Sequence, residues 1–364
     1  MKLENFYNKY SKNKVFQIIL YLASILFLIC YKARLFLYKW NFLKTTKLNG
    51  FVVSVGNITS GGTGKTPTVI ELAKYFLHKG KKVAVLCRGY KIKDLNKIIL
   101  VSDGQEILVD YDICGDEPLL IAKKVPSCMV FVGKDRIKSG RTALRLGANV
   151  LILDDGFQYI KLARDKNIAI IDCTNPFDNN HLLPLGKLRE LPDSLERSDA
   201  LILSNYNLSS IKENDLKTLN HYTKNKPAGI IHYEIAEFKS LNTKVTKKPK
   251  DMEGLKCIIA SGIGNPGAFE SLLKQTGINI MSHIKYNDHH LYGDEDITKI
   301  TKEAQKYNVE DVIVTEKDAI KIEEWCQSEP ITYWSANIGL YWNTPGYFDN
   351  LFGNIEQAVS SQRN

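Results

Sequence analysis

Short apolar stretches recur along most of the chain, and longer stretches of mixed polarity separate them. The apolar stretches are rich in β-branched residues and predict strands at residues 51–55, 83–87, 129–132, 149–154, 168–172 and 200–204. The intervening segments follow a helical period, as residues 67–78 do after the first strand. Strands that alternate with helices and are apolar throughout are typical of a doubly wound α/β domain with a buried parallel sheet.

The same alternation continues in the second part of the chain, where it predicts a smaller α/β domain. Strands are expected at residues 255–260, 278–284 and 311–315, and helices at 266–275 and 294–307. A basic, proline-containing stretch at 244–250 indicates a linker, and a length of 364 residues favours two domains. We therefore expect a first domain at 48–235, a linker at 236–253, and a second domain at 254–364 whose tail is free to pack back on the first.

Residues 1–47 form a separate N-terminal segment with a long apolar centre. Residues 15–31 contain no charge over 17 positions and are bounded by Lys14 and Lys32. As a helix this run would be roughly 25 Å long, at the short end of what crosses a bilayer. It lacks the cleavage site of a secretory signal and the amphipathic pattern of a soluble core helix, so we expect a membrane-associating helix. Because both flanks are basic, the sequence leaves open whether this helix spans the membrane or lies in the interface.

The distribution of charge separates this segment from the rest of the chain. The formal net charge is +9, and residues 1–50 hold nine basic residues and one acidic residue, so the other 314 residues are almost neutral. This distribution argues against a nucleic-acid partner, which would need a basic body, and nothing in the sequence implies a protein partner. Seven cysteines without a C-x-x-C pair favour reduced thiols in a cytoplasmic protein over disulfides or a zinc site.

A glycine-rich loop joins the first predicted strand to the helix that follows it. The loop reads Gly56-Asn-Ile-Thr-Ser-Gly-Gly-Thr-Gly-Lys-Thr66, and strand, loop and helix together are the context of a phosphate-binding P-loop. Lys65 is expected to reach the β- and γ-phosphates of ATP, and Thr66 to bind Mg²⁺. Thr59 stands where the usual pattern has glycine. The residues expected to bind the nucleotide are Gly61, Gly62, Thr63, Gly64, Lys65 and Thr66.

The apolar strand at 149–154 runs into two adjacent carboxylates, Asp154 and Asp155. A carboxylate at the carboxyl end of a buried parallel strand is how P-loop proteins bring negative charge to the metal. If the strand continued through both residues, their side chains would point to opposite faces and only one would face the metal. The P-loop and this acid pair predict a site for a nucleoside triphosphate with Mg²⁺, and they leave the acceptor open.

Further motifs carry a resemblance to a known family. In order they are SVGNITSGGTGKTP, RGY, GDEP, GKDR, DDGFQ, LLPLGKLRE, ASGIGNPGAF, DHHLY and TEKDAIK. From about residue 50 to 320 this order resembles the tetraacyldisaccharide 4′-kinases, the lipid A 4′-kinases of Gram-negative bacteria. The resemblance implies transfer of the γ-phosphoryl group of ATP to the 4′-hydroxyl of tetraacyldisaccharide 1-phosphate, giving lipid IVA. It also implies work at the inner leaflet, on the cytoplasmic face of the bacterial inner membrane.

The resemblance implies roles for individual residues. Asp116 would be the general base, paired with His289. His290 is the competing candidate for that histidine. From the residues alone, Asp116 and Glu117 before Pro118 also fit an ordinary helix start. Glu117 would join Asp154 and Asp155 around magnesium, with the direct ligand left open. The residues implied to contact the disaccharide or its phosphate are Arg88, Tyr90, Arg136, Gln158 and Arg189. Tyr159 departs from the family pattern, in which histidine is more common.

Two alternatives remain in view. Residues 262–267 match G-x-G-x-x-G, with Asp288 21 residues further on, as in a dinucleotide site. Because the nucleotide machinery is already complete upstream, we interpret these glycines as a turn that opens a helix. The alternative function is a regulatory or partitioning P-loop ATPase on a membrane, but Ser60 stands where those proteins have a signature lysine.

Overall fold

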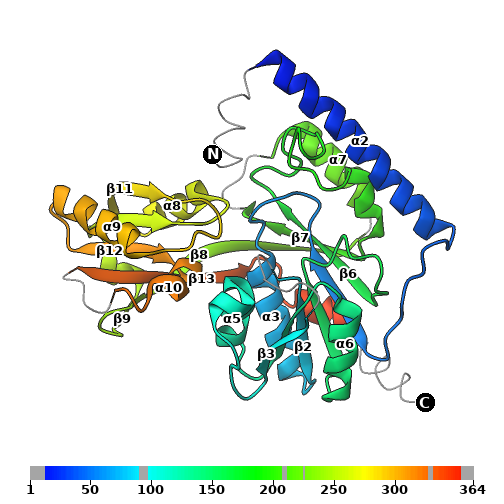
Figure 1. The fold of residues 1–364 in the computed structure, drawn as a ribbon, viewed down its shortest axis with the longest axis horizontal. Coiled ribbons are helices and arrows are strands. Elements are labelled where there is room, and N and C mark those ends of the chain that lie inside the picture. Colours follow the sequence, from blue (N-terminus) through cyan, green and yellow to red (C-terminus); the bar gives the residue numbers. More distant parts are fainter. Residues whose placement is uncertain (1–12, 90–96, 207–210, 224–225, 327–330, 354–364) are drawn as a thin grey trace.

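The computed structural model describes residues 13–89, 97–206, 211–223, 226–326 and 331–353. In this part of the chain, 13 strands form one sheet in the order β11-β10-β12-β13-β8-β7-β6-β1-β5-β2-β4-β3, with β9 paired to β8. Helices cover both faces of the sheet, which curves from a smaller lobe to a larger one (Figure 1). The mixed α/β class expected from the sequence is confirmed.

The larger lobe, here called the first lobe, is built on strands β1 to β7. They are β1 (Phe51–Gly56), β2 (Val83–Cys87), β3 (Ile99–Asp103), β4 (Met129–Val132), β5 (Val150–Asp154), β6 (Lys166–Asp172) and β7 (Ala200–Ser204). All pair in parallel except β3, which is antiparallel to β4 at the edge. The central strands β1, β2 and β5 are buried at every position, which explains their unbroken apolar character.

In the first lobe, helices follow the strands along the chain, so that helix starts lie near the carboxyl ends of strands. The helices are α3 (Lys65–His78), α4 (Tyr111–Cys114), α5 (Asp116–Lys124), α6 (Arg136–Arg145), η1 (Pro192–Arg197) and α7 (Glu213–Thr223). The helix after Gly115 begins at Asp116, so Asp116, Glu117 and Pro118 all lie in its first turn. Proline is tolerated there because the first-turn N–H groups of a helix have no partner within the helix.

The second lobe continues the same sheet. It contains β10 (Lys256–Ser261), β11 (Asn279–Lys285) and β12 (Asp311–Thr315), with α8 (Pro266–Gln275), α9 (Asp294–Lys306) and α10 (Glu316–Ile322). Its strands pair in parallel. These elements lie within one residue of the ranges expected from the apolar pattern, and α10 continues directly from β12.

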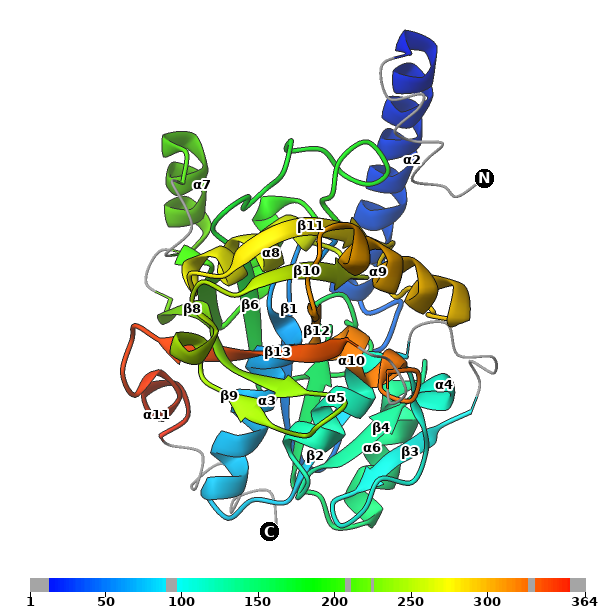
Figure 2. The same ribbon diagram turned by 90° about the vertical axis from the view of Figure 1, so that its left-hand side faces the viewer.

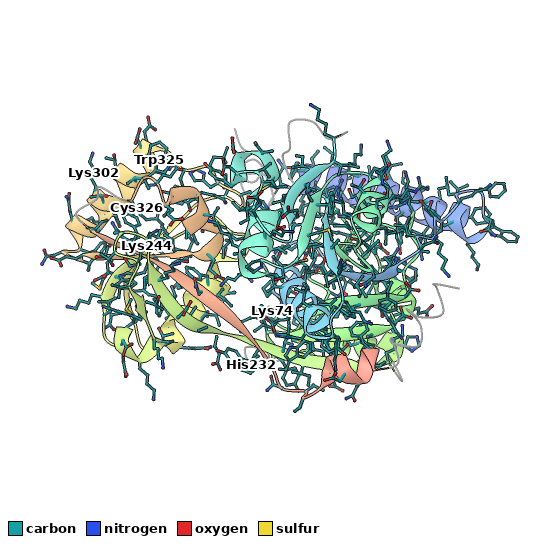
Figure 3. The ribbon with its side chains drawn as sticks, turned by 90° about the horizontal axis from the view of Figure 1, so that it is seen from below. Lys74, His232, Lys244, Lys302, Trp325 and Cys326 are labelled. Atoms are coloured by element: carbon teal, nitrogen blue, oxygen red, sulfur yellow. The ribbon has the colours of Figure 1, made fainter. Side chains whose placement is uncertain are left out.

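Two long strands join the lobes. Strand β8 (Ala228–Ser240) starts parallel to β7 and then runs antiparallel to β13 (Thr332–Trp342), which itself pairs with β12. His232 lies on this strand pair, Lys74 on the first lobe and Lys244 on the second (Figure 3). The linker expected at 236–253 is instead the end of β8, the short strand β9 (Thr246–Lys247) and η3 (Pro249–Met252). Alternating burial along β8 shows why this segment forms a strand.

The chain returns to the first lobe at its C-terminal end. Helix α11 (Tyr347–Phe352) follows β13 and buries its aromatic side chains against α3 and β1. The Phe352 ring lies 5.0 Å from that of Phe76 and 6.3 Å from that of Phe51, between ring centroids. The last described helix therefore closes the core of the first lobe.

Helix α2 (Lys14–Lys39) is a long apolar rod that projects from the body (Figure 2). Ser24 is its buried residue and donates a hydrogen bond to the carbonyl of Leu182 at 3.0 Å. Lys32 pairs with Asp193 at 2.7 Å. By length and composition α2 could cross a membrane, and most of its apolar side chains are exposed. The helix is consistent with membrane association.

Candidate active site

The glycine-rich loop after β1 wraps around the start of α3. Gly61 and Gly64 adopt left-handed backbone angles, with φ of 115° and 87°, and Gly64 is the N-cap of α3. Lys65 begins the helix, and its Nζ donates to the carbonyl of Gly61 at 3.3 Å. Thr66 follows it, with its side chain at the helix N-terminus and mostly buried. Backbone N–H groups and a lysine converge here on one place suited to phosphate oxygens.

Thr59 fits the loop without glycine. Its φ is not in the left-handed region, and it forms an isolated bridge to Leu188. The next residue, Ser60, donates its backbone N–H to the carbonyl of Lys187 at 2.7 Å. The start of the loop is therefore anchored to the segment that carries Arg189.

Asp154 and Asp155, at the end of β5, both line the cavity described below. Strand β5 ends at Asp154, and Asp155 has a left-handed φ of 51°, so the strand does not continue through it. Asp155 accepts from Arg189 Nη1 at 2.8 and 2.9 Å and lies 3.9 Å from Lys65 Nζ. The rule of opposite faces therefore does not apply, because the backbone turns between the two residues.

The two acids differ in their electrostatic surroundings. Burial raises the pKa of Asp155, but the charges of Lys65 and Arg189 outweigh it and hold the pKa below its ordinary value. Burial, together with the charges of Glu117 and Asp155, raises the pKa of Asp154 above its ordinary value. Asp154 Oδ1 is buried and has no hydrogen-bond partner among the described residues.

Asp116 and His289 come together from opposite lobes. Asp116 is the first residue of α5 and is 7% exposed, and His289 follows β11 in the second lobe. His289 Nδ1 lies 3.1 Å from both carboxylate oxygens of Asp116. The hydrogen bond to Asp116 raises the pKa of His289, with burial opposing it. Burial would raise the pKa of Asp116, but the hydrogen bond from His289 and the charge of Lys321 hold it below its ordinary value.

His290 faces away from this pair. Its Nε2 lies 2.9 Å from Asp296 Oδ2, and its ring stacks on Tyr286 with 4.4 Å between centroids. His289 has a left-handed φ of 55°, which a side chain other than glycine rarely adopts. The turn is held because the His289 N–H donates to the carbonyl of Gly262 at 3.1 Å. Such strain is typical of residues that the surrounding structure holds in place for a function.

The glycines at 262–267 serve this close approach. A Cβ at Gly262 would lie 3.1 Å from the Cβ of His290, and a Cβ at Gly264 would lie 3.2 Å from Asp288 Oδ2. The Cβ position of Gly264 is also 3.7 Å from the backbone N of Gly62 in the P-loop. Gly262 and Gly264 therefore let the turn with His289 and the P-loop meet, whereas Gly267 lies in the first turn of α8.

A cavity of about 860 Å³ connects these groups. Most of the site residues expected from the sequence line this cavity. They are the P-loop from Gly61 to Thr66, the acid pairs Asp116–Glu117 and Asp154–Asp155, His289, Arg88 and Arg189. Its lining also contains apolar side chains, among them Ile70, Phe269, Leu272, Ile338 and Leu340. The cavity thus offers both charged groups suited to phosphates and apolar surface suited to a ring or chain.

Two residues expected to contact the acceptor do not line the cavity. Arg136 is 2% exposed, and its Nη1 donates to the backbone carbonyl of Asp155 at 3.3 Å. Gln158 donates its Nε2 to the carbonyl of Asn57 at 2.8 Å. In this structure both side chains support the loops that carry site residues. Tyr90 lies outside the described residues.

Two lysines of α10 were not singled out by the sequence analysis. Lys317 pairs with Glu117, and Lys321 pairs with Asp116 at 2.9 Å. The charge of Lys317 lowers the pKa of Glu117, with burial opposing it. The two lysines stand four residues apart in TEKDAIK, so they share one face of a helix. That spacing was the available signal, but only the fold shows which face meets α5.

The donor set fits a magnesium ion that shares its ligands with phosphates. Within the described ranges no three His, Cys, Asp or Glu side chains form a metal-ligating group. Magnesium in nucleotide sites is held by one or two protein oxygens together with phosphate oxygens and water. The unpartnered, buried Asp154 oxygen lies in the same cavity as Thr66 and meets that need. Asp155 and Glu117 are instead occupied by cationic side chains.

Comparisons with known proteins agree on one family. A family model described as tetraacyldisaccharide-1-P 4′-kinase matches residues 16–355. A tetraacyldisaccharide 4′-kinase from Halothermothrix orenii is 36% identical over 343 residues, covering 89% of this chain and 88% of the relative. One from Syntrophus aciditrophicus is 36% identical over 316 residues, covering 84% of each. Among solved structures, the crystal structure of LpxK from Aquifex aeolicus in complex with ATP matches this fold with a TM-score of 0.73. The two sequences are 31% identical, and the match covers 94% of this chain and 99% of that one.

Proposed function

This chain belongs to the tetraacyldisaccharide-1-P 4′-kinase family, and we propose that it transfers the γ-phosphoryl group of ATP to the 4′-hydroxyl of tetraacyldisaccharide 1-phosphate. The product would be lipid IVA in lipid A biosynthesis. The observation that carries the proposal is that one cavity holds both a P-loop and the Asp116–His289 pair. An ATPase would need only to orient water, whereas a carboxylate held at the same cavity suits a hydroxyl acceptor.

The proposed step is an in-line displacement at the γ-phosphorus. The 4′-oxygen forms a bond to phosphorus while the bond to the bridging oxygen of ADP breaks, and the hydroxyl proton passes to Asp116. His289 orients the carboxylate through contacts at 3.1 Å to both oxygens. Lys65 and the backbone N–H groups of the P-loop would hold the β- and γ-phosphates. The phosphorylated lipid and ADP then leave.

The residues that would hold Mg²⁺ are Thr66 and Asp154, with Glu117 and Asp155 nearby. The buried, unpartnered oxygen of Asp154 supports this assignment. When bound, the ion would neutralise charge on the phosphate oxygens. Arg189 lines the cavity and holds Asp155, so it can fix the acid and offer charge to the acceptor. Arg88 is the second cavity arginine that fits an anionic acceptor.

The acceptor is a lipid, and helix α2 supports access to it from a membrane. Its apolar side chains are exposed along most of its length, and basic residues flank the apolar run. Basic flanks favour an anionic leaflet, and the nearly neutral body with free thiols fits the cytoplasmic face of the inner membrane. Arg34 of α2 donates to the carbonyl of Gln158 at 2.8 Å, so the helix base lies beside the loop after Asp155.

The test is a phosphoryl-transfer assay with the full-length protein. Protein in detergent is incubated with γ-labelled ATP, magnesium and tetraacyldisaccharide 1-phosphate, and the lipids are separated. We expect label in a bis-phosphorylated lipid, and no transfer when the acceptor lacks a free 4′-hydroxyl. Steady hydrolysis of ATP with no labelled lipid would overturn the proposal and favour an ATPase.

A further inference from the structure

Lys321 is a buried lysine behind the Asp116 carboxylate. Its side chain is 3% exposed, and Nζ lies 2.9 Å from Asp116 Oδ2 and 3.8 Å from Asp318 Oδ1. Asp116 lines the cavity, whereas Lys321 does not. The ammonium therefore contacts the carboxylate without itself lining the cavity. A lysine without solvent is retained only when its charge is compensated, so this pairing is a specific feature of the fold.

Asp318 anchors the start of the helix that carries Lys321. Its side chain is fully buried, and its Oδ2 accepts from Thr315 Oγ1 at 2.6 Å and from the backbone N of Gly262 at 3.0 Å. Thr315 is the N-cap of α10, so the same bonds fix the start of the helix that carries Lys321. The ion pair with Asp116 is thus built on a rigid element.

One residue, Gly262, contacts both the turn that carries His289 and the helix that carries Lys321. Gly262 donates its N–H to Asp318, and its carbonyl accepts from the N–H of His289. The turn with His289 and the helix with Lys321 are therefore both held by the residue that follows β10. A further contact of the carboxylate is local, because the N–H of Glu117 donates to Asp116 Oδ1 at 3.0 Å. Both oxygens of Asp116 are thereby fixed in orientation.

We propose that Lys321 is a positioning residue for phosphoryl transfer, which holds the Asp116 carboxylate in the orientation that accepts the hydroxyl proton. This inference rests on the proposed function of Asp116. Lys317 differs, because it lines the cavity and pairs with Glu117 rather than with Asp116.

The experiment is a kinetic double-variant cycle in the full-length protein. Wild type, Lys321→Met, Asp116→Asn and the double variant are compared for kcat and for KM of ATP. Lys302→Met is the matched control, because Lys302 is an exposed lysine on α9 of the same lobe (Figure 3). We expect Lys321→Met to lower kcat by roughly 10- to 100-fold, part of the 10²–10⁴-fold that general acid–base catalysis contributes. KM for ATP should change by less than about twofold, because Lys321 lies outside the cavity.

The decisive comparison is the effect of Lys321→Met in the Asp116→Asn background. A residue that acts through Asp116 has nothing left to position there, so we expect no further loss of kcat. The same fold-loss in both backgrounds, or wild-type kcat in Lys321→Met, would overturn the inference. If Lys321→Met does not yield folded protein by circular dichroism, the cycle is run with Lys321→Gln, which keeps a donor of similar length. An inactive wild type would instead count against the proposed function itself.

Discussion

Gly64 in the P-loop is a position where alanine should be excluded for two separate reasons. Its φ of 87° lies in the left-handed region, which costs a residue with a side chain about 1–3 kcal/mol. A Cβ built there would also lie 2.7 Å from Tyr233 Cζ and closer still to its hydroxyl oxygen. Tyr233 is buried on β8 and donates to the Gly64 carbonyl at 3.3 Å, so it has little room to move.

The loop provides variants that separate the two effects. Gly62→Ala adds a Cβ with no neighbour within 4 Å and no left-handed φ, so we expect a change in unfolding free energy within about 0.5 kcal/mol. Gly61→Ala adds strain without a contact and should cost about 1–3 kcal/mol. Gly64→Ala has the same backbone strain and adds overpacking of about 1–3 kcal/mol. Its total loss of unfolding free energy should therefore be roughly 2–6 kcal/mol.

The assay is urea unfolding in detergent, followed by tryptophan fluorescence, with ATP binding measured on each folded variant. In a Tyr233→Phe background the closest atom is gone, so Gly64→Ala should cost less than in wild type, by about 1 kcal/mol or more. Equal losses for Gly61→Ala and Gly64→Ala would refute the steric part of the reasoning. A Gly64→Ala protein as stable as wild type would refute both parts.

Asp116→Asn should lower kcat by about 10²–10⁴-fold with ATP affinity retained, in labelled-lipid assays beside calorimetric titration; full turnover would remove Asp116 from the mechanism. Chelation with EDTA should abolish transfer and added Mg²⁺ restore it, whereas undiminished transfer would contradict the metal assignment. Deleting residues 1–47 should release the protein from membrane vesicles in flotation while ATP still binds; retention on vesicles would place the attachment elsewhere. Phe352→Ala should cost about 3–5 kcal/mol in unfolding free energy, because it empties the contact with Phe76, and a negligible loss would mean that α11 does not secure the first lobe.

The sequence determined the elements well because their signals are local. Apolar runs with β-branched residues marked the buried strands, and the ranges of α8 and β12 were predicted to the residue. The connection between the lobes was harder to predict, because the basic stretch at 244–250 suggested a linker, whereas β8 reaches Ser240 and β9 lies within that stretch. Only pairing with β13 and β9 makes residues 228–240 one continuous strand. Strands that pair with partners distant in the chain carry no signal of that pairing in their own local sequence.

The site divides in the same way. The sequence by itself determined the P-loop, because its glycines, lysine and threonine act through backbone geometry within one short segment. The resemblance pointed to Asp116 and His289, but only the tertiary structure decided that they meet, 173 residues apart in the chain. It also decided that Asp155 turns into the cavity beside Asp154, and that Lys321 lies behind Asp116. The sequence specifies which groups are present, whereas orientation and charge pairing depend on the surfaces that folding brings together.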